Sequence, residues 1–319
     1  MALVILVDCQ RFLLSRVETE YARARHAAII ELHMAQALTN PIAANVARLY
    51  HYEKFCPAWL TTTLCDQKIF CSNPATFNDP WDGKPQVDYR PMEENSGEME
   101  AYLESCRNMV GADLLKDSVR PLWEQRVRTD PHALRNSTTL LSQKLAAEIA
   151  KRRIYCLVPC PRNTLMWSHY AAKHSGICLE FYVSNLLFLK ALKVNYSTEY
   201  PKFLPQDMQK LALEVILTKS KEWDYEQEFR IVGTPNRVGD QSLHLDGDYL
   251  RLPHRALESV IVGCKGDYDA VKKIVSEHAP YIKVKRAEIV SYQYQLRIIN
   301  PEPDPEREAI VQKRRSQST

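Results

Sequence analysis

The most constraining feature of this sequence is an irregular succession of strand-like and helix-like segments. Short apolar runs bounded by turn residues predict strands, and a long helical block from 97 to 153 interrupts them. A doubly wound parallel sheet requires regular alternation of strands and helices, so this order favours an α+β domain. The chain also lacks the glycine-rich phosphate-binding motifs of Walker-type nucleoside triphosphatases and of ordinary dinucleotide-binding domains, which disfavours both classes.

One folded domain is expected, flanked by two segments of different character. Residues 1–45 have a helical composition that ends near a Thr-Asn-Pro stop signal, which predicts an N-terminal helical extension. Residues 46–300 are predicted to form a single α+β domain of catalytic type, with residues 97–153 as a helical insert. The tail 301–319 is charged, and we expect it to be disordered.

Composition and charge indicate a soluble protein rather than one that wraps a polyanion, because the formal net charge is only +3. Nine scattered cysteines show no zinc-site spacing, and reduced thiols in the cytoplasm fit them best. The apolar opening Met1–Val7 is too short to span a membrane. We therefore expect a cytoplasmic protein without membrane contact, and we leave its oligomeric state open.

The stretch from Lys219 to Val232 concentrates polar and aromatic side chains and is predicted to be a helix end running into a short strand over 226–232. Side chains two residues apart on a strand share a face, so Glu226 and Glu228 would stand together, with Arg230 next in the row. Two carboxylates on one sheet face repel each other, so a fold keeps them either in water or for chemistry. The plain interpretation is a solvated strand face with a Glu–Arg pair.

Three further segments carry chemistry-bearing side chains. His51 follows Tyr50 on a predicted strand, where a lone histidine is usually packed and hydrogen-bonded. Tyr170 lies at the end of a short predicted helix, where aromatic side chains usually belong to a core. Asp79 and Asp82 lie in a proline-fixed loop and could bind Mg²⁺, but ordinary turn chemistry is the favoured interpretation.

Taken in order, these segments resemble the bacterial family called domain of unknown function 2971. The resemblance covers roughly residues 47–300 and leaves the N-terminal extension outside. The matching segments are Leu49-Tyr50-His51-Tyr52, Ile69 through Asp82, Met166 through Tyr170 with His174 through Phe181, Trp223 through Arg230, and Val260-Ile261-Val262-Gly263.

The motif order is also similar to that of ADP-ribosyltransferases of the His-Tyr-Glu kind. That resemblance implies a mixed, mostly antiparallel sheet core, into which the helical block predicted from this sequence would be inserted. It also implies NAD as the substrate, a ribose-binding histidine on the first strand, an aromatic tyrosine, and a glutamate on a late strand, often within E-x-E. Two departures affect Tyr170: a helical block separates the first and second motifs, and Tyr170 precedes its strand.

Carried over to this sequence, the resemblance assigns Glu228 to the ribose and the developing oxocarbenium charge, and Glu226 to activation of the acceptor. The resemblance leaves open which of the two residues has which role. Arg230 is as well suited to holding the carboxylates as to touching a pyrophosphate. The expected cofactor-binding residues are His51, Tyr170, Tyr50 and Arg230.

The leading hypothesis is therefore a mono-ADP-ribosyltransferase of phage-defence or toxin type that uses NAD as its substrate and has no metal site. Whether the acceptor is a protein or a nucleic acid is left open. One alternative is a metal-dependent nuclease using Asp79, Asp82, Glu226 and Glu228, although the E-x-K pattern common in such sites is missing. The other is a non-catalytic interaction or sensor module of a defence system, with the carboxylates in structural salt bridges. The transferase hypothesis requires His51, Tyr170 and Glu228 to line one cleft.

Overall fold

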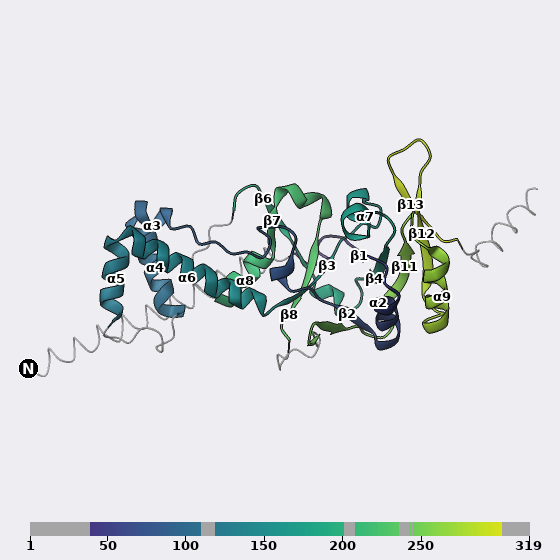
Figure 1. The fold of residues 1–319 in the computed structure, drawn as a ribbon, viewed down its shortest axis with the longest axis horizontal. Coiled ribbons are helices and arrows are strands. Elements are labelled where there is room, and N and C mark those ends of the chain that lie inside the picture. Colours follow the sequence, from purple (N-terminus) through teal and green to yellow (C-terminus); the bar gives the residue numbers. More distant parts are fainter. Residues whose placement is uncertain (1–38, 110–118, 201–207, 236–242, 244, 302–319) are drawn as a thin grey trace, which may run out of the picture. The chain divides into compact units, whose positions relative to one another are not determined.

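The structure is a computed structural model that describes residues 39–109, 119–200, 208–235, 243 and 245–301 (Figure 1). The predicted N-terminal extension lies almost wholly outside the described residues, and so does the predicted disordered tail. The chain divides after Asn40, and every element below belongs to the unit that starts at Pro41. This unit combines a curled, mostly antiparallel sheet with several helices, which confirms the predicted α+β class.

The main sheet has five strands in the order β1-β4-β11-β12-β13 (Figure 1). Its strands pair antiparallel except for β11 and β12, which are parallel and are joined by the helix α9 (Tyr268–His278). The side chain of Asp267 caps this helix by accepting the N–H of Ala270. The strand bounds are β1 (Arg48–Glu53), β4 (Ile177–Tyr182), β11 (Leu257–Val262), β12 (Lys283–Ile289) and β13 (Leu296–Ile299).

A second sheet, in the order β3-β8-β5, continues the curl beyond β1. Tyr50 in β1 and Val158 just after β3 exchange two backbone hydrogen bonds of 2.8 Å each. The edge of the first sheet thereby lies beside the edge of the second, which brings the first predicted strand close to the late carboxylate segment. The bounds are β3 (Arg153–Leu157), β5 (Leu192–Lys193) and β8 (Phe229–Gly233).

Two small sheets complete the strand set. The antiparallel one has the order β2-β10-β9, and its β2 is followed by Ser72, which pairs with Ile154 of β3. The other is the parallel pair β6 and β7. The bounds are β2 (Lys68–Phe70), β6 (Asn195–Ser197), β7 (Thr218–Ser220), β9 (Leu245–Asp246) and β10 (Tyr249–Arg251).

Where the structure describes it, the block from 97 to 153 is mostly helical, and two of its helices begin beside a proline. One helix carries Pro121 in its first turn, and the next begins at Pro131 with Asp130 as its side-chain cap. The insert has its own core, which includes Tyr102, Leu103 and Leu134. Its helices are α3 (Arg90–Glu94), α4 (Ser96–Met109), α5 (Arg120–Thr129) and α6 (Pro131–Ala150).

The remaining helical segments are short, and within the described residues no helix is both long and apolar enough to cross a membrane. α8 packs against α6 through Val215, Ile216, Leu145 and Ile149. The segments are α2 (Pro57–Thr61), the π-turn η1 (Thr62–Asp66), η2 (Pro74–Thr76), α7 (Thr164–Tyr170), η3 (Phe188–Lys190), α8 (Met208–Ile216) and η4 (Lys221–Glu226).

The main core covers the face of β1 that carries Leu49, where α9 contributes Val271 and Val275. The opposite face packs Tyr52 against α7 through Trp167. Both faces of β1 are therefore covered, and its alternating side chains serve two different environments. His51 shares the face of Leu49, whereas Tyr50 points to the other side.

Local chain geometry fixes the end of α7 against the end of β1. Asn163 caps α7 by accepting the N–H of Leu165, and residues 172–174 then turn back with positive φ angles of 47°, 56° and 74°. Gly176 follows, and a Cβ at that position would lie only 2.3 Å from the carbonyl oxygen of Glu53. A glycine is therefore needed where β4 starts beside the last residue of β1.

Candidate functional site

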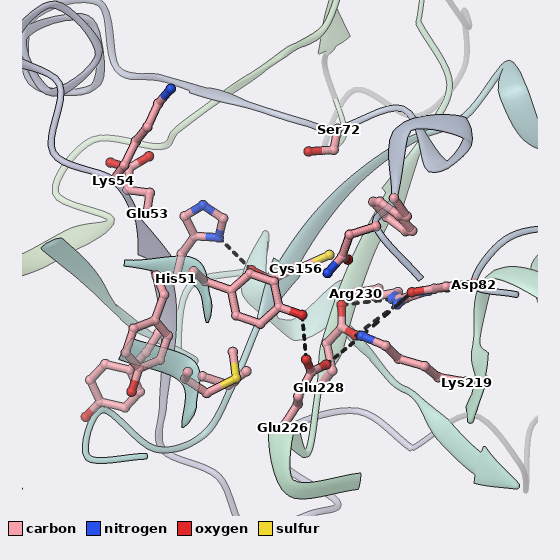
Figure 2. A pocket seen from close by; sticks show the side chains of 17 residues that line it. His51, Glu53, Lys54, Ser72, Asp82, Cys156, Lys219, Glu226, Glu228 and Arg230 are labelled. Atoms are coloured by element: carbon pink, nitrogen blue, oxygen red, sulfur yellow. Dashed lines mark hydrogen bonds and ion pairs between the residues drawn. The ribbon is translucent and has the colours of Figure 1, made fainter. Parts of the chain in front are cut away.

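A cavity of about 300 Å³ lies between β1, the end of α7 and the start of β8 (Figure 2). His51, Tyr170 and Glu228 all line it, as do Glu226 and Arg230. The geometric requirement drawn from the sequence is met, because residues from three distant parts of the chain face one cleft. Asp82, which was expected beside the glutamates only in the nuclease alternative, and Lys219, for which no role was predicted, complete its charged wall.

The two glutamates meet by a route different from the predicted one. Glu226 ends the 3-10 helix η4, Gln227 adopts a left-handed conformation with φ of 50°, and Glu228 immediately precedes β8. The prediction of a single strand over 226–232 was therefore wrong at its start. The left-handed residue kinks the backbone, so the carboxylates converge on a cation instead of standing in a row on a sheet face.

That cation is Lys219 in β7, which is 7% exposed. Its Nζ lies 2.6 Å from Glu226 Oε2, 3.4 Å from Glu228 Oε2 and 3.7 Å from Asp82 Oδ2. The remaining oxygen of Glu226 accepts the hydroxyl hydrogen of Tyr170 at 2.7 Å. Glu226 thus links the end of α7 to the charged cluster and fixes the position of the Tyr170 ring.

Arg230 is fully buried and donates all five of its N–H groups within the protein. Nε and Nη2 lie 2.9 Å from the two oxygens of Glu228, and Nη1 and Nη2 lie 2.8 and 2.6 Å from the two oxygens of Asp82. Nη1 also donates to the carbonyl oxygen of Ile216. Because five donors are the whole capacity of a guanidinium, these contacts favour the carboxylate-holding role of Arg230 over a pyrophosphate contact.

Charge in this cluster is not balanced. Three carboxylates (Asp82, Glu226 and Glu228) face two cations (Lys219 and Arg230), which leaves a formal surplus of one negative charge. Burial alone would raise the pKa of Glu228, but Arg230 and Lys219 outweigh it and hold that pKa at about 2. Burial and the neighbouring Glu228 raise the pKa of Glu226. The pocket wall therefore presents one carboxylate that is ionised at neutral pH, Glu228, beside a more basic one, Glu226.

His51 is held as a neutral imidazole with a defined orientation. Burial lowers its pKa to about 4, its ring stacks on Tyr155 at 4.3 Å between centroids, and its Nδ1 lies 2.7 Å from the carbonyl oxygen of Cys156. A carbonyl can only accept, so Nδ1 carries the proton and Nε2 is left as an acceptor. This arrangement suits a ligand that offers a hydroxyl hydrogen.

Tyr50 also belongs to the cavity lining, but its hydroxyl serves a separate network on the other face of β1. It donates to Glu180 at 3.1 Å, and the same carboxylate accepts from Ser259 and pairs with Lys285. These contacts favour a structural role for Tyr50. Its assignment as a cofactor-binding residue stays a prediction.

The residues of the nuclease alternative do not assemble as a metal-binding set. Asp79 is not part of the cavity lining, and its Oδ1 accepts the N–H of Trp81 at 2.9 Å, which is the turn chemistry expected from the sequence. Lys219 and Arg230 occupy the space between the other three carboxylates. Among the described residues, no group of three His, Cys, Asp or Glu side chains has metal-binding geometry.

Glu53 is a titratable lining residue that the sequence analysis did not identify. It ends β1 two residues after His51, and within the described part of the chain its carboxylate has no hydrogen-bonding or ion-pairing partner. Burial raises its pKa from 4.5 to about 7. No sequence pattern singles it out, because one glutamate at a strand end is usually solvated.

This burial predicts a pH-dependent stability. Because the folded state binds the Glu53 proton more tightly than the unfolded state does, the free energy of unfolding falls as the pH rises from about 4.5 to about 7. Glu53→Gln removes this loss, so at pH 8 the variant is expected to be more stable than the wild type by about 2–3 kcal/mol. Urea titrations at pH 4.5 and pH 8 check this.

A matched control for that experiment is Glu277→Gln, which changes an exposed glutamate on α9. The difference in the free energy of unfolding between this variant and the wild type is expected to be the same at pH 4.5 and at pH 8. If Glu53→Gln behaves in the same way as this control, the Glu53 carboxylate is not buried without a partner.

The fold and the site together define a mixed α+β protein with a buried, asymmetrically charged pocket. Residues 166–231 match the model of a family described as "Protein of unknown function (DUF2971)". The matched segment contains Tyr170, Lys219, Glu226, Glu228 and Arg230, so it supplies one side of the pocket. Comparison with curated proteins and with solved structures gave no significant match.

Proposed function

We propose that this protein is an NAD-dependent mono-ADP-ribosyltransferase. The observation that carries the proposal is the convergence of His51, Tyr170 and the Glu226–Glu228 pair on one cavity. Their order along the chain, with a histidine on the first strand and a glutamate at a late strand, is similar to that of ADP-ribosyltransferases of the His-Tyr-Glu kind. A curled, mostly antiparallel sheet is compatible with an ADP-ribosyltransferase-like fold, which forms part of the proposal.

The charge of the cluster suits this chemistry. Cleavage of the nicotinamide–ribose bond develops positive charge at the ribose carbon, and a fixed negative charge beside it lowers the barrier. Glu228 is held ionised by Arg230 and Lys219, and the cluster has one negative charge more than its cations neutralise. In this proposal Glu228 therefore stabilises the oxocarbenium-like transition state.

The neutral side chains would orient the substrate. The free Nε2 of His51 accepts a hydrogen bond from a ribose hydroxyl, and the ring of Tyr170, held through Glu226, stacks on the nicotinamide. Nicotinamide and its ribose would fill a cavity of about 300 Å³, which leaves the rest of the dinucleotide outside it. A defence or toxin-type role with a protein or nucleic-acid acceptor rests on the family resemblance.

The competing interpretation is a non-catalytic interaction or sensor module. It draws on the same Arg230 network, since Asp82 and Glu228 are both fully engaged by one guanidinium. Such a network could exist for stability alone. The unbalanced charge and the Nε2 of His51, which accepts no hydrogen bond from the described residues, support the transferase, because a developing positive charge and a ribose hydroxyl would use them.

Binding of NAD without any added metal ion is the expected result of calorimetry on the full chain. His51→Ala removes the ribose hydrogen bond and is expected to weaken NAD binding by about tenfold, while Glu277→Gln leaves it unchanged. Nuclease assays with and without Mg²⁺ or Mn²⁺ complete the experiment. Metal-dependent cleavage of nucleic acid with no NAD binding would favour the nuclease alternative instead.

A further inference from the structure

A second cavity, of about 410 Å³, adjoins the first and shares His51, Glu53, Ser72 and Cys156 with it. Its other walls come from α2, η1, β2, β3, β4 and β10. The second cavity adds the aromatic side chains Trp59, Phe70 and Tyr249, beside aliphatic and threonine side chains and Lys68. The two cavities therefore meet at β1, and the charged cluster lines the first while three exposed aromatic side chains line the second.

Much of the aromatic surface in the second cavity is open to solvent. Trp59, Phe70 and Tyr249 are 48%, 55% and 39% exposed, and the rings of Phe70 and Tyr249 meet edge to face at 5.6 Å. Large apolar side chains gathered around a hollow are costly to leave in water. A flat aromatic group is the ligand chemistry that such a wall favours.

Glu53 lies at the junction of the two cavities. It projects from the same face of β1 as His51, the residue proposed to hold the ribose, and Figure 2 shows both side chains on one strand, across the pocket from Lys219. A nucleophile seated in the second cavity would therefore approach the ribose past Glu53. Any group that takes a proton from that nucleophile must lie on this path.

The other glutamates of the pocket are less suited to that task. Both oxygens of Glu228 bind Arg230, and those of Glu226 bind Tyr170 and Lys219. Glu53 has no such partner within the described residues. Its carboxylate is thus free to accept a proton without breaking an existing contact.

We propose that the second cavity binds the acceptor through an aromatic or heteroaromatic group, and that Glu53 accepts the proton of the acceptor's O–H or N–H nucleophile. The proposal rests on the transferase function proposed above. In the reaction, the bond between the ribose carbon and the nicotinamide nitrogen breaks, and nicotinamide leaves with the electron pair. The acceptor O or N forms the new bond to that carbon, and its proton moves to the Glu53 carboxylate.

This role replaces the acceptor activation that the sequence assigned to Glu226. It also gives Glu53 a pH signature, because burial raises its pKa to about 7. Burial lowers the pKa of His51 to about 4 and raises the pKa values of Tyr155 and Cys178. Among these three residues and Glu53, Glu53 is therefore the one that titrates near neutral pH. The titratable and charged groups that face or flank Glu53 are His51, Lys54, Lys68, Tyr155 and Cys178.

The test measures nicotinamide release and label transfer side by side, using labelled NAD and the full chain. The acceptor probes are guanosine, thymidine and N-acetyltyrosinamide, with agmatine as a non-aromatic probe. Label is expected to pass to an aromatic probe in preference to agmatine. Glu53→Gln is expected to lower that transfer about a hundredfold or more, and to lower nicotinamide release to water much less. Glu277→Gln should change neither rate.

The pH profile separates a proton acceptor from a structural residue. Wild-type transfer is expected to rise through about pH 7, and this rise is absent from Glu53→Gln. Glu226→Gln, run in parallel, should keep the rise. A Glu53→Gln protein with the wild-type transfer rate and profile would overturn the role of Glu53, and so would loss of the rise in Glu226→Gln alone.

The remaining outcomes are equally decisive. Preference for agmatine, or nicotinamide release without labelling of any aromatic probe, would overturn the aromatic acceptor site while the transferase function stands. Absence of both NAD binding and nicotinamide release in the wild type would remove the proposed function, and this inference with it.

Discussion

Glu228→Gln is expected to slow nicotinamide release by about a hundred- to a thousandfold while NAD affinity changes much less. The substitution keeps the size of the side chain and part of its hydrogen bonding but removes its charge. Arg230 and Lys219 hold the pKa of Glu228 at about 2, so the wild type presents this charge at neutral pH. The positive charge that it matches exists mainly in the transition state, so the loss falls on the chemical step.

The measurement is single-turnover nicotinamide release at saturating NAD, with NAD affinity taken from calorimetry. Circular dichroism must first show a folded protein, because the neutral amide of the variant would leave Arg230 and Lys219 with one carboxylate fewer. Glu277→Gln on α9 is the exposed control. A folded Glu228→Gln protein with the wild-type release rate would identify the carboxylates as structural and support the non-catalytic alternative.

Much of the fold could be predicted because it depends on local patterns. The strand around His51 and the helical character of the block from 97 to 153 follow from the sequence pattern, and the structure has both where it describes them. The grouping of His51, Tyr170 and Glu228 in one cleft was also anticipated, but from motif order rather than from any physical pattern.

The parts that could not be predicted depend on contacts between distant residues or on one unusual backbone angle. Nothing in the sequence around Gln227 predicts its left-handed φ angle. This angle replaces the start of the predicted strand with a kink, and the kink lets Glu226 and Glu228 both contact Lys219. Lys219 itself lay in a predicted helix that ends at Ile216 in the structure. A sequence pattern shows which side chains share a face of one strand or helix. It does not show which cation of another strand will contact those side chains.

The pairing of Asp82 with Arg230 is the clearest long-range case, since 148 residues separate two side chains that share two hydrogen bonds. From the sequence, Asp82 belonged to a turn or to a magnesium site. In the structure Asp82 is 3% exposed and accepts hydrogen bonds from Nη1 and Nη2 of Arg230, while Glu228 accepts from Nε and Nη2. This buried triad couples the loop after η2 to the start of β8 and so holds the charged wall of the pocket in place.

Asp82→Ala is therefore expected to destabilise the fold by about 3–5 kcal/mol, because it leaves part of a buried guanidinium without its partner. Asp66→Ala, at an exposed aspartate, should stay within about 0.5 kcal/mol of the wild type. Urea denaturation at neutral pH measures both.

The double variant Asp82→Ala with Arg230→Met removes the buried cation too, and it is expected to recover part of the lost stability. A loss of stability below about 1 kcal/mol for Asp82→Ala would mean that water reaches Arg230. The low pKa of Glu228 depends on a water-free pairing with the same guanidinium, so that low pKa would be wrong as well.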